Sequence, residues 1–322
     1  MMWHDNSEAS VILLAKTAPM REFTDTQTPV QRPGRPAIGR MRASDGASSG
    51  PPTSVIEARQ RLLDLDFGAM WQRRELLYFL VWRDVKVRYK QTAIGAAWAV
   101  LSPLLTVLIF AVVFGRLAKI PSDGLPYIVF AFAGFLPWTY FAQALARSSV
   151  SLVGNAQLIT KVYFPRLMIP LSAVTTPAVD FCLSLLSLFG LMLWYRIAPS
   201  WSLLALPLFL LLAAAIALAI GLWLAPLNVR YRDVNHTIPF LVQAWMYASP
   251  VVYPLSLVPE PWRFVYSLNP MVGVIEGFRW SLVGADHPNV VAIAVSVAVT
   301  VPLLLGGLVF FRRMERAFAD VI

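Results

Sequence analysis

Long runs without charge constrain this chain more than any other feature of its sequence. Six stretches are long enough, as helices, to cross a hydrocarbon core about 30 Å thick, and the one charged residue among them is Asp180. Backbone groups inside a membrane must satisfy their hydrogen bonds within the segment, as a helix does. We therefore predict an all-α polytopic membrane protein with six transmembrane helices. The predicted spans are residues 93–115, 125–146, 167–195, 202–226, 237–257 and 289–311.

The basic residues predict how these spans are oriented. The chain has 27 Lys and Arg residues against 18 Asp and Glu residues, a formal net charge of +9. If the N-terminus is cytoplasmic, the cytoplasmic segments from residue 71 onward carry fourteen Lys and Arg residues, and the outer segments carry five. Cytoplasmic loops are enriched in Lys and Arg. The sequence therefore predicts that both termini are cytoplasmic, and that the excess charge forms a layer on that side.

The region before the first span has two parts. Residues 29–54 are rich in Pro, Gly, Ser and Ala and bury too little apolar surface to offset chain entropy, so we predict a disordered cytoplasmic tail over residues 1–54. Residues 55–92 are predicted to form cytoplasmic or interfacial amphipathic helices, because aromatic and basic residues fall on opposite helical faces within 71–92. Two interpretations stay open: a topology anchor, or a surface that guides an anionic lipid-linked substrate or contacts a partner.

The loop between the second and third predicted spans carries a short apolar patch among basic residues. A cytoplasmic helix with exposed apolar side chains is typical of a docking surface. Packing of the same side chains against the protein's own helices is an equally open interpretation. The patch consists of Leu158, Ile159, Val162, Tyr163 and Phe164.

Residues 260–285 contain two apolar stretches that are too short to span a membrane and are joined by the turn signal Asn269-Pro270. We predict a re-entrant helical hairpin on the outer side, since protein or water can shelter such a backbone. Gly273 and Gly277 form a small-xxx-small pair that permits close helix contact. The alternative is a pair of helices that lie on the membrane surface.

Two further features inside the spans suggest function. Asp180 requires a partner or water, or stays protonated and hydrogen-bonded as a structural element. Aromatic and amide side chains on one helical face suit sugar rings, although lipid contact and helix packing also explain aromatic residues. The candidate channel-lining residues are Trp98, Phe110, Trp138, Phe240, Gln243 and Tyr247.

The sequence lacks the motifs of several kinds of enzyme and metal site. It contains no G-x-x-x-x-G-K-[ST] motif, no H-E-x-x-H motif and no carboxylate pair with catalytic spacing. One Cys and three scattered His residues do not suggest a zinc site. We therefore predict that this chain is not an enzyme, has no catalytic or metal-binding residues and binds no cofactor itself. Nucleic acid is not a predicted partner, because the basic residues follow membrane topology.

Four segments in order resemble the ABC-2 type permeases that export lipid-linked polysaccharides such as O-antigen, capsule and teichoic acid. The first runs from Arg83 to Trp98 and is similar to the family pattern R-D-x-K-V-R-Y-K-Q-T-x-x-G-x-x-W. The second, from Asn155 to Arg166, is similar to N-x-x-L-I-x-K-x-x-F-P-R. The third is residues 228–234, and the fourth combines Ser249-Pro250 with the hairpin residues 269–279. The resemblance covers about residues 55–322, so residues 1–54 lie outside it.

This resemblance implies a permease that exports a polyprenyl-diphosphate-linked polysaccharide across the bacterial cytoplasmic (inner) membrane. It implies a homodimer with two separate cytoplasmic ATPase subunits, which bind the ATP and Mg²⁺. The expected substrate-access residues, near the interface, are Arg83, Lys86, Arg88, Tyr89 and Lys90. The expected ATPase-coupling residues, in a cytoplasmic coupling helix, are Gln157, Leu158, Ile159, Lys161, Tyr163, Phe164 and Arg166. The expected outer gate residues, in the hairpin, are Tyr253, Trp262, Asn269, Pro270, Glu276 and Arg279.

Two other classes of function remain as alternatives. One is a membrane-embedded glycan transferase or polymerase, although the sequence shows no obvious acid–base pair for it. The other is an ion-coupled flippase for a lipid-linked glycan, which would use Asp180. The sequence does not identify the glycan.

Overall fold

The computed structural model describes residues 67–90, 95–162, 164–231, 233–284 and 288–315, which all belong to one compact unit. These described residues form helices and no strands, as predicted for an all-α protein. The helices are α1 (Phe67–Gln72), α2 (Arg74–Lys90), α3 (Gly95–Phe110), α4 (Tyr127–Gly154), α5 (Ala156–Lys161), α6 (Met168–Thr175), α7 (Ala178–Trp194), α8 (Leu206–Arg230), α9 (Val234–Tyr247), α10 (Glu260–Ser267), α11 (Pro270–Val283) and α12 (Val290–Glu315).

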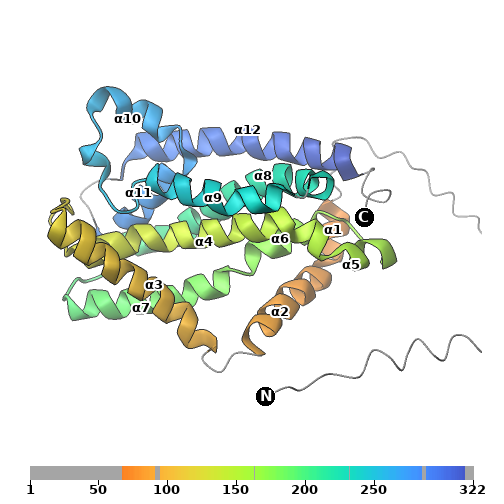
Figure 1. Ribbon diagram of the computed structural model, residues 1–322, viewed down its shortest axis with the longest axis horizontal. Coiled ribbons are helices and arrows are strands. Elements are labelled where there is room, and N and C mark those ends of the chain that lie inside the picture. The colour runs from red at the N-terminus through yellow and green to blue at the C-terminus, as the bar shows by residue number, and fades with distance from the viewer. Residues whose placement is uncertain (1–66, 91–94, 163, 232, 285–287, 316–322) are drawn as a thin grey trace, which may run out of the picture. The chain divides into compact units, whose positions relative to one another are not determined.

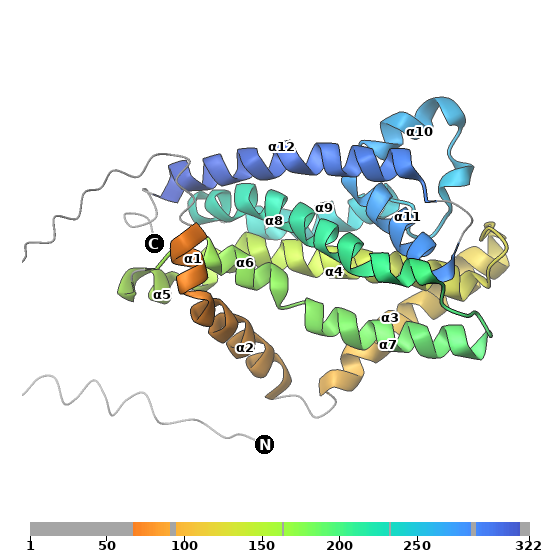
Figure 2. The same cartoon turned by 180° about the vertical axis from the view of Figure 1, so that it is seen from behind.

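The centre of the unit is α4, which packs against α3, α6, α7, α8 and α11. The short helix α10 lies at one end of the bundle, and α1 and α5 lie at the opposite end (Figures 1 and 2). We refer to these ends as the α10 end and the α5 end. The predicted disordered tail, residues 1–54, lies outside the described residues.

Five helical segments in the described part of the chain are long and apolar enough to cross a membrane. They contain 21 to 30 residues and overlap five of the six predicted spans. Their bounds are Ala97–Leu117, Tyr127–Gly154, Met168–Trp194, Trp201–Arg230 and Val290–Glu315. The first includes a π-helical turn at Ala111–Leu117, and the fourth begins with a 3₁₀ turn at Trp201–Ala205.

The remaining predicted span, residues 237–257, was too long. Its helix α9 has 14 residues, a length of about 21 Å at roughly 1.5 Å per residue, and ends at Tyr247. A turn follows, because Pro250 cannot donate a backbone hydrogen bond and disfavours helical geometry at Ser249. The chain then continues through the 3₁₀ turn Leu255–Leu257 into α10 and α11, which form the predicted pair of short helices.

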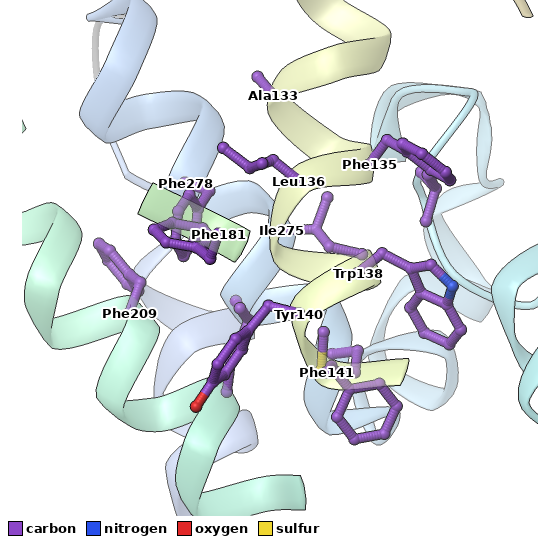
Figure 3. Close-up of a cluster of buried hydrophobic side chains, with 14 of the residues drawn as sticks. Ala133, Phe135, Leu136, Trp138, Tyr140, Phe141, Phe181, Phe209, Ile275 and Phe278 are labelled. Atoms are coloured by element: carbon purple, nitrogen blue, oxygen red, sulfur yellow. The ribbon is translucent and has the colours of Figure 1, made fainter. Parts of the chain in front are cut away.

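Aromatic side chains from different helices form the core. Phe181 of α7, Phe209 of α8 and Phe278 of α11 converge, as Figure 3 shows, with ring centroids 5.7 Å apart for Phe181–Phe278 and 6.5 Å for Phe209–Phe278. Phe141 of α4 makes an edge-to-face contact with Trp245 of α9 at 5.1 Å. These contacts attach both α9 and α11 to the spanning helices, so the segment after α8 is packed and not peripheral.

The predicted close approach at the two hairpin glycines is confirmed. A Cβ atom at Gly273 would lie 2.5 Å from the backbone oxygen of Ala292 in α12, and one at Gly277 would lie 2.2 Å from the ring of Phe209. The backbone N–H of Gly273 also donates to Ser296 Oγ at 3.1 Å. Only glycine permits this approach, because any larger residue would separate α11 from α12.

Gly273→Ala is expected to lower the free energy of unfolding by about 1–3 kcal/mol, because the new methyl group meets a backbone oxygen that a rotamer change cannot move. Thermal unfolding of the purified chain in detergent measures the loss. The matched control is Gly190→Ala in α7, where a Cβ atom meets nothing within 4 Å. That control is expected to stabilise α7 by about 0.5–1 kcal/mol. Equal effects of the two substitutions would contradict the packing argument.

Candidate functional site

A cavity of about 560 Å³ lies between the end of α2 and the helices α3, α4 and α7. Its lining combines charged, amide, hydroxyl and aromatic side chains, which is uncommon between apolar helices. The lining residues used below are Arg88, Tyr89, Trp98, Tyr140, Gln143 and Asp180.

Asp180 occupies this cavity because the third span is interrupted. Helix α6 ends at Thr175 and α7 begins at Ala178 after Pro177, so Asp180 lies in the first turn of α7 and not inside a continuous helix. The positive end of the α7 dipole favours a carboxylate there. Its side chain is only 8% exposed, yet it forms an ion pair with Arg88 and accepts a hydrogen bond from the Tyr89 hydroxyl. Asp180 thus has its partners on α2.

The Tyr89 hydroxyl is protonated in this arrangement. Burial, followed by the hydrogen bond to Asp180, raises the pKa of Tyr89 to about 12. A neutral phenol can donate to a carboxylate across the whole physiological range. The pair therefore joins α2 to α7 by one ion pair and one charge-assisted hydrogen bond.

Two further contacts fix α2 to the rest of the unit. Arg83 contacts Asp84 Oδ1 at 2.8 Å and donates to Asn155 Oδ1, just before α5, at 2.9 Å. Arg88 also donates to Gln143 Oε1 of α4 at 3.4 Å. Of the five predicted substrate-access residues, the structure brings Arg88 and Tyr89 together in the cavity and places Arg83 one turn away. It leaves Lys86 and Lys90 on the exposed surface.

Two aromatic residues of α2, Tyr78 and Trp82, are exposed, whereas Tyr89 lines the cavity. The rings of Tyr78 and Trp82 stack with centroids 6.4 Å apart, and these residues are 69% and 54% exposed. The helix packs against the protein through Leu80, which is 2% exposed. Stacked exposed aromatics at the edge of a spanning bundle suit a membrane interface, where amphipathic helices bury their apolar face in lipid.

A second cavity of about 320 Å³ shares four lining residues with the first and continues it between α3, α4 and α9. Of the predicted channel-lining residues, Trp98 lines the first cavity, and Phe110, Trp138 and Gln243 line the second. Phe240 and Tyr247 line neither and are 72% and 54% exposed on α9. The shared residues are Thr106, Phe135, Thr139 and Gln143.

Of the two open interpretations of the apolar patch near α5, packing against the protein's own helices holds for Ile159 and Phe164. Ile159 is 8% exposed and Phe164 is 6% exposed, because both pack into a cluster with Leu80, Leu152 and Met168 at the α5 end. Here the alternative of packing against the protein's own helices applies.

The other predicted coupling residues occupy different positions around α5. Gln157 and Lys161 are exposed, and Leu158 is half-buried. Arg166 donates to the backbone oxygen of Glu315 at 2.6 Å, which ties this loop to the end of α12. Tyr163 lies outside the described residues. A coupling role for this set remains a prediction.

The predicted gate residues of the hairpin act as packing contacts. The Asn269 side chain accepts from Met271 N and Trp245 Nε1 at 3.0 and 2.9 Å, and donates to Ala248 O and Ser249 Oγ at 3.0 and 2.9 Å. It caps α11 and joins it to the end of α9. Pro270 follows as the first residue of α11, a position that Pro favours.

A buried ion pair holds the second hairpin helix. Arg279 NH1 lies 3.1 Å from Glu276 Oε1, Arg279 NH2 donates to Val251 O at 2.8 Å, and the guanidinium lies 3.8 Å from the ring centre of Phe130 in α4. Nearby, the hydroxyls of Tyr253 and Tyr266 are 2.8 Å apart. Trp262 stays 64% exposed on α10. The hairpin is therefore firmly attached through α11 and exposed at α10.

Sequence reasoning missed Gln143 and Arg147, which lie one turn apart on α4. Arg147 was placed in the cytoplasmic loop, but α4 continues to Gly154 and carries Arg147 on a helical face beside α2. Together with Arg83, Asp84, Val87 and Arg88 it lines a third cavity of about 460 Å³. The i, i+4 spacing of two polar residues at the end of an apolar run was the available signal.

Comparison with known proteins gives consistent matches. The profile of the ABC-2 type transporter family matches residues 75–283. The O-antigen export system permease protein RfbA of Myxococcus xanthus is 31% identical over 255 residues, covering 79% of this chain and 97% of that protein. RfbA of Klebsiella pneumoniae is 27% identical over 77% of this chain and 95% of its own length. The polysialic acid transport protein KpsM of Escherichia coli is 22% identical over 73% of this chain and 92% of its own length.

Proposed function

Since this chain belongs to the ABC-2 type transporter family, we propose that it is the permease of an ATP-driven exporter of polyprenyl-diphosphate-linked polysaccharide. The observation that carries the proposal is the match to the Myxococcus permease over 97% of that protein, together with the family profile that matches residues 75–283. The substrate would pass from the cytoplasmic to the outer side of the bacterial inner membrane.

The connected cavities support a polysaccharide path. They run from the Arg88–Asp180 pair to Gln243 and offer aromatic faces beside amide and hydroxyl groups. Sugar rings stack their C–H faces on aromatic side chains and use their hydroxyls to bond amides. Trp98 beside the first cavity is 58% exposed, so it is available for such stacking.

A second copy of the chain would complete this path. Only 6% of the first span, Ala97–Leu117, is buried within the chain. Phe240 and Tyr247 on α9 are also exposed, on a helix that borders the second cavity. A homodimer that joins these surfaces would enclose the cavities and bring all six predicted channel residues to one passage.

Six crossings would place both termini in the cytoplasm. Helix α12 ends beside Arg166 at the α5 end, and it starts beside Gly273 of the hairpin. The chain between α8 and α12 must therefore travel from one end of the bundle to the other. Helix α9 and the turn after it would provide this sixth crossing, although α9 is shorter than an ordinary span.

The energy would come from two separate ATPase subunits, which would bind ATP and Mg²⁺, since this sequence has no P-loop motif. The exposed residues of α5 and its C-cap, Gln157, Thr160, Lys161 and Val162, would form the contact. Arg83 links α2 to Asn155 next to α5, so motion of α5 would reach the substrate cavity through α2.

Lys161→Glu is expected to weaken association with the cognate ATPase about tenfold, or roughly 1.4 kcal/mol, without lowering stability, because Lys161 is exposed at the proposed contact. Co-purification from detergent and binding kinetics measure the change. The control is Lys119→Glu, which alters an exposed lysine between α3 and α4. Undiminished association of Lys161→Glu would contradict the assignment of this surface.

Reconstituted transport tests the function itself. Proteoliposomes that contain the full chain and its ATPase are expected to move a fluorescent polyprenyl-diphosphate oligosaccharide to the opposite leaflet only when ATP and Mg²⁺ are present. Movement by the chain alone, driven by a proton gradient, would instead support the ion-coupled flippase. Glycan turnover by the chain alone would support the transferase.

A further inference from the structure

Three guanidinium groups surround the cavity of about 460 Å³ between α2 and α4. They belong to Arg83, Arg88 and Arg147, and the one carboxylate in the lining is Asp84. Asp84 is already engaged, since Arg83 Nε and NH2 both donate to its Oδ1 at 2.9 and 2.8 Å. The cavity therefore has an excess of positive charge.

Arg147 is the most informative of the three. It is half-buried, and within the described part of the chain no hydrogen bond or ion pair of its guanidinium is found. Its electrostatic neighbours include Arg88, which repels it, and Asp180 and Asp84, which attract it. Because this half-buried guanidinium lines the cavity, it can bind an anionic ligand there through charge-assisted hydrogen bonds.

Arg88 lines both this cavity and the larger one that contains Asp180. Its guanidinium is directed to the Asp180 carboxylate, which is an oxygen acceptor of the same kind as a phosphate. A diphosphate carries more charge and more acceptor oxygens than one carboxylate, and two guanidinium groups can each bind it through paired hydrogen bonds.

We infer that Arg88 and Arg147 form a diphosphate site, and that Asp180 is an internal anion which holds Arg88 until the diphosphate displaces it. The inference rests on the proposed function and specifies where the substrate's headgroup binds. Displacement would break the ion pair between α2 and α7. With the ion pair broken, α2 would be held to Asp180 by the Tyr89 hydrogen bond alone.

This site differs from general attraction by the basic surface. Lys86 and Lys90 are exposed on α2 and line none of the three cavities described above, so their charge acts at longer range. Arg147 lies on α4, a spanning helix, and provides a fixed position against which α2 can close. The cavity is also large enough, since small-ligand sites occupy roughly 300–1,000 Å³.

Binding without transport tests the inference. The full chain in phosphatidylcholine nanodiscs is titrated with polyprenyl diphosphate that carries no glycan, and with the uncharged polyprenol. Arg147→Gln is expected to weaken diphosphate binding about tenfold or more, the loss of one charge-assisted contact, and to leave polyprenol binding unchanged. Asp180→Asn is expected to strengthen diphosphate binding several-fold, because the amide keeps a hydrogen bond to Tyr89 but no longer competes for Arg88.

Controls separate the site from surface charge and from misfolding. Arg313→Gln removes one exposed positive charge near the end of α12 and is expected to change diphosphate affinity less than about twofold. Arg147→Lys is expected to restore part of the affinity, since it returns the charge without the paired donors. Polyprenol affinity and the thermal unfolding midpoint report whether each variant is folded.

Specific outcomes overturn the inference. If the wild-type chain prefers the diphosphate but Arg147→Gln and Asp180→Asn do not change that preference, the site assignment fails while the proposed export function stands. If the wild-type chain does not prefer the diphosphate over the polyprenol, the proposal of a diphosphate-linked substrate is contradicted, and so is the inference that rests on it. Inorganic diphosphate is the third probe: its own inhibition constant against lipid binding is expected to be higher for Arg147→Gln than for the wild type, and equal inhibition constants contradict the site.

Discussion

Arg279→Met is expected to lower the free energy of unfolding by about 3–5 kcal/mol, the usual cost of removing one partner of a buried ion pair. Arg279 is 7% exposed and lies in α11, where it contacts Glu276, the backbone oxygen of Val251 and the ring of Phe130. Methionine fills similar volume but leaves the Glu276 carboxylate and the Val251 oxygen without their donor. Chemical denaturation of the purified chain in detergent measures the loss.

The double substitution Glu276→Gln with Arg279→Met separates the charge from the packing. Replacing both members of a buried pair is often nearly neutral, so the double variant is expected to recover a large part of the loss. A double variant that loses the sum of both single effects would show that Arg279 acts through Phe130 and Val251 and not through Glu276. The result matters because a firmly paired Arg279 makes α11 a fixed support for the rest of the hairpin.

Phe164→Ala is expected to cost about 3–5 kcal/mol of stability, the range for removing a large aromatic side chain from a core. Phe164 belongs to the cluster that joins α2, α4, α6, α8 and α12 at the α5 end, and it is 6% exposed. Its truncation leaves a cavity beneath α5. Thermal unfolding in detergent measures the effect.

Lys161 provides a contrast with Phe164, since both residues lie in the motif from Asn155 to Arg166 but only Lys161 is exposed. Lys161→Glu is expected to change stability by no more than about 0.5 kcal/mol, as most exposed substitutions do, and to act on ATPase association. Phe164→Ala is expected to reduce association only as far as it unfolds the α5 end. Normal stability together with lost association in Phe164→Ala would mean that this ring contacts the partner directly.

Much of the fold could be predicted from the sequence, because a membrane restricts which backbone structures can cross it. Five predicted spans match helices in the structure, since length and absence of charge suffice where every backbone hydrogen bond must be internal. The same rule overestimated the span at 237–257. Three of its apolar residues after Tyr247, namely Val251, Val252 and Leu255, are buried within the protein, so their apolar character serves packing and not contact with lipid.

The site was predicted only in outline. Arg88 and Tyr89 were identified from the basic motif before the first span, and Asp180 was singled out as a carboxylate that needs a partner. That these residues meet could not be deduced, because 91 positions separate Tyr89 from Asp180. Arg147 was assigned to a loop because charge marked the end of the predicted span, whereas the helix continues through it.

The sequence by itself determined that this is an all-helical membrane protein of the ABC-2 type, because charge-free length and four ordered motifs are local properties that need no contacts. The tertiary structure decided which of its side chains are buried, which are exposed and which meet one another. It buried Phe164 and exposed Lys161, although both lie in one motif, because helix packing at the α5 end covers one face only. It also joined Asp180 to Arg88 and left Arg147 beside them, since side chains distant in sequence meet only where helices cross.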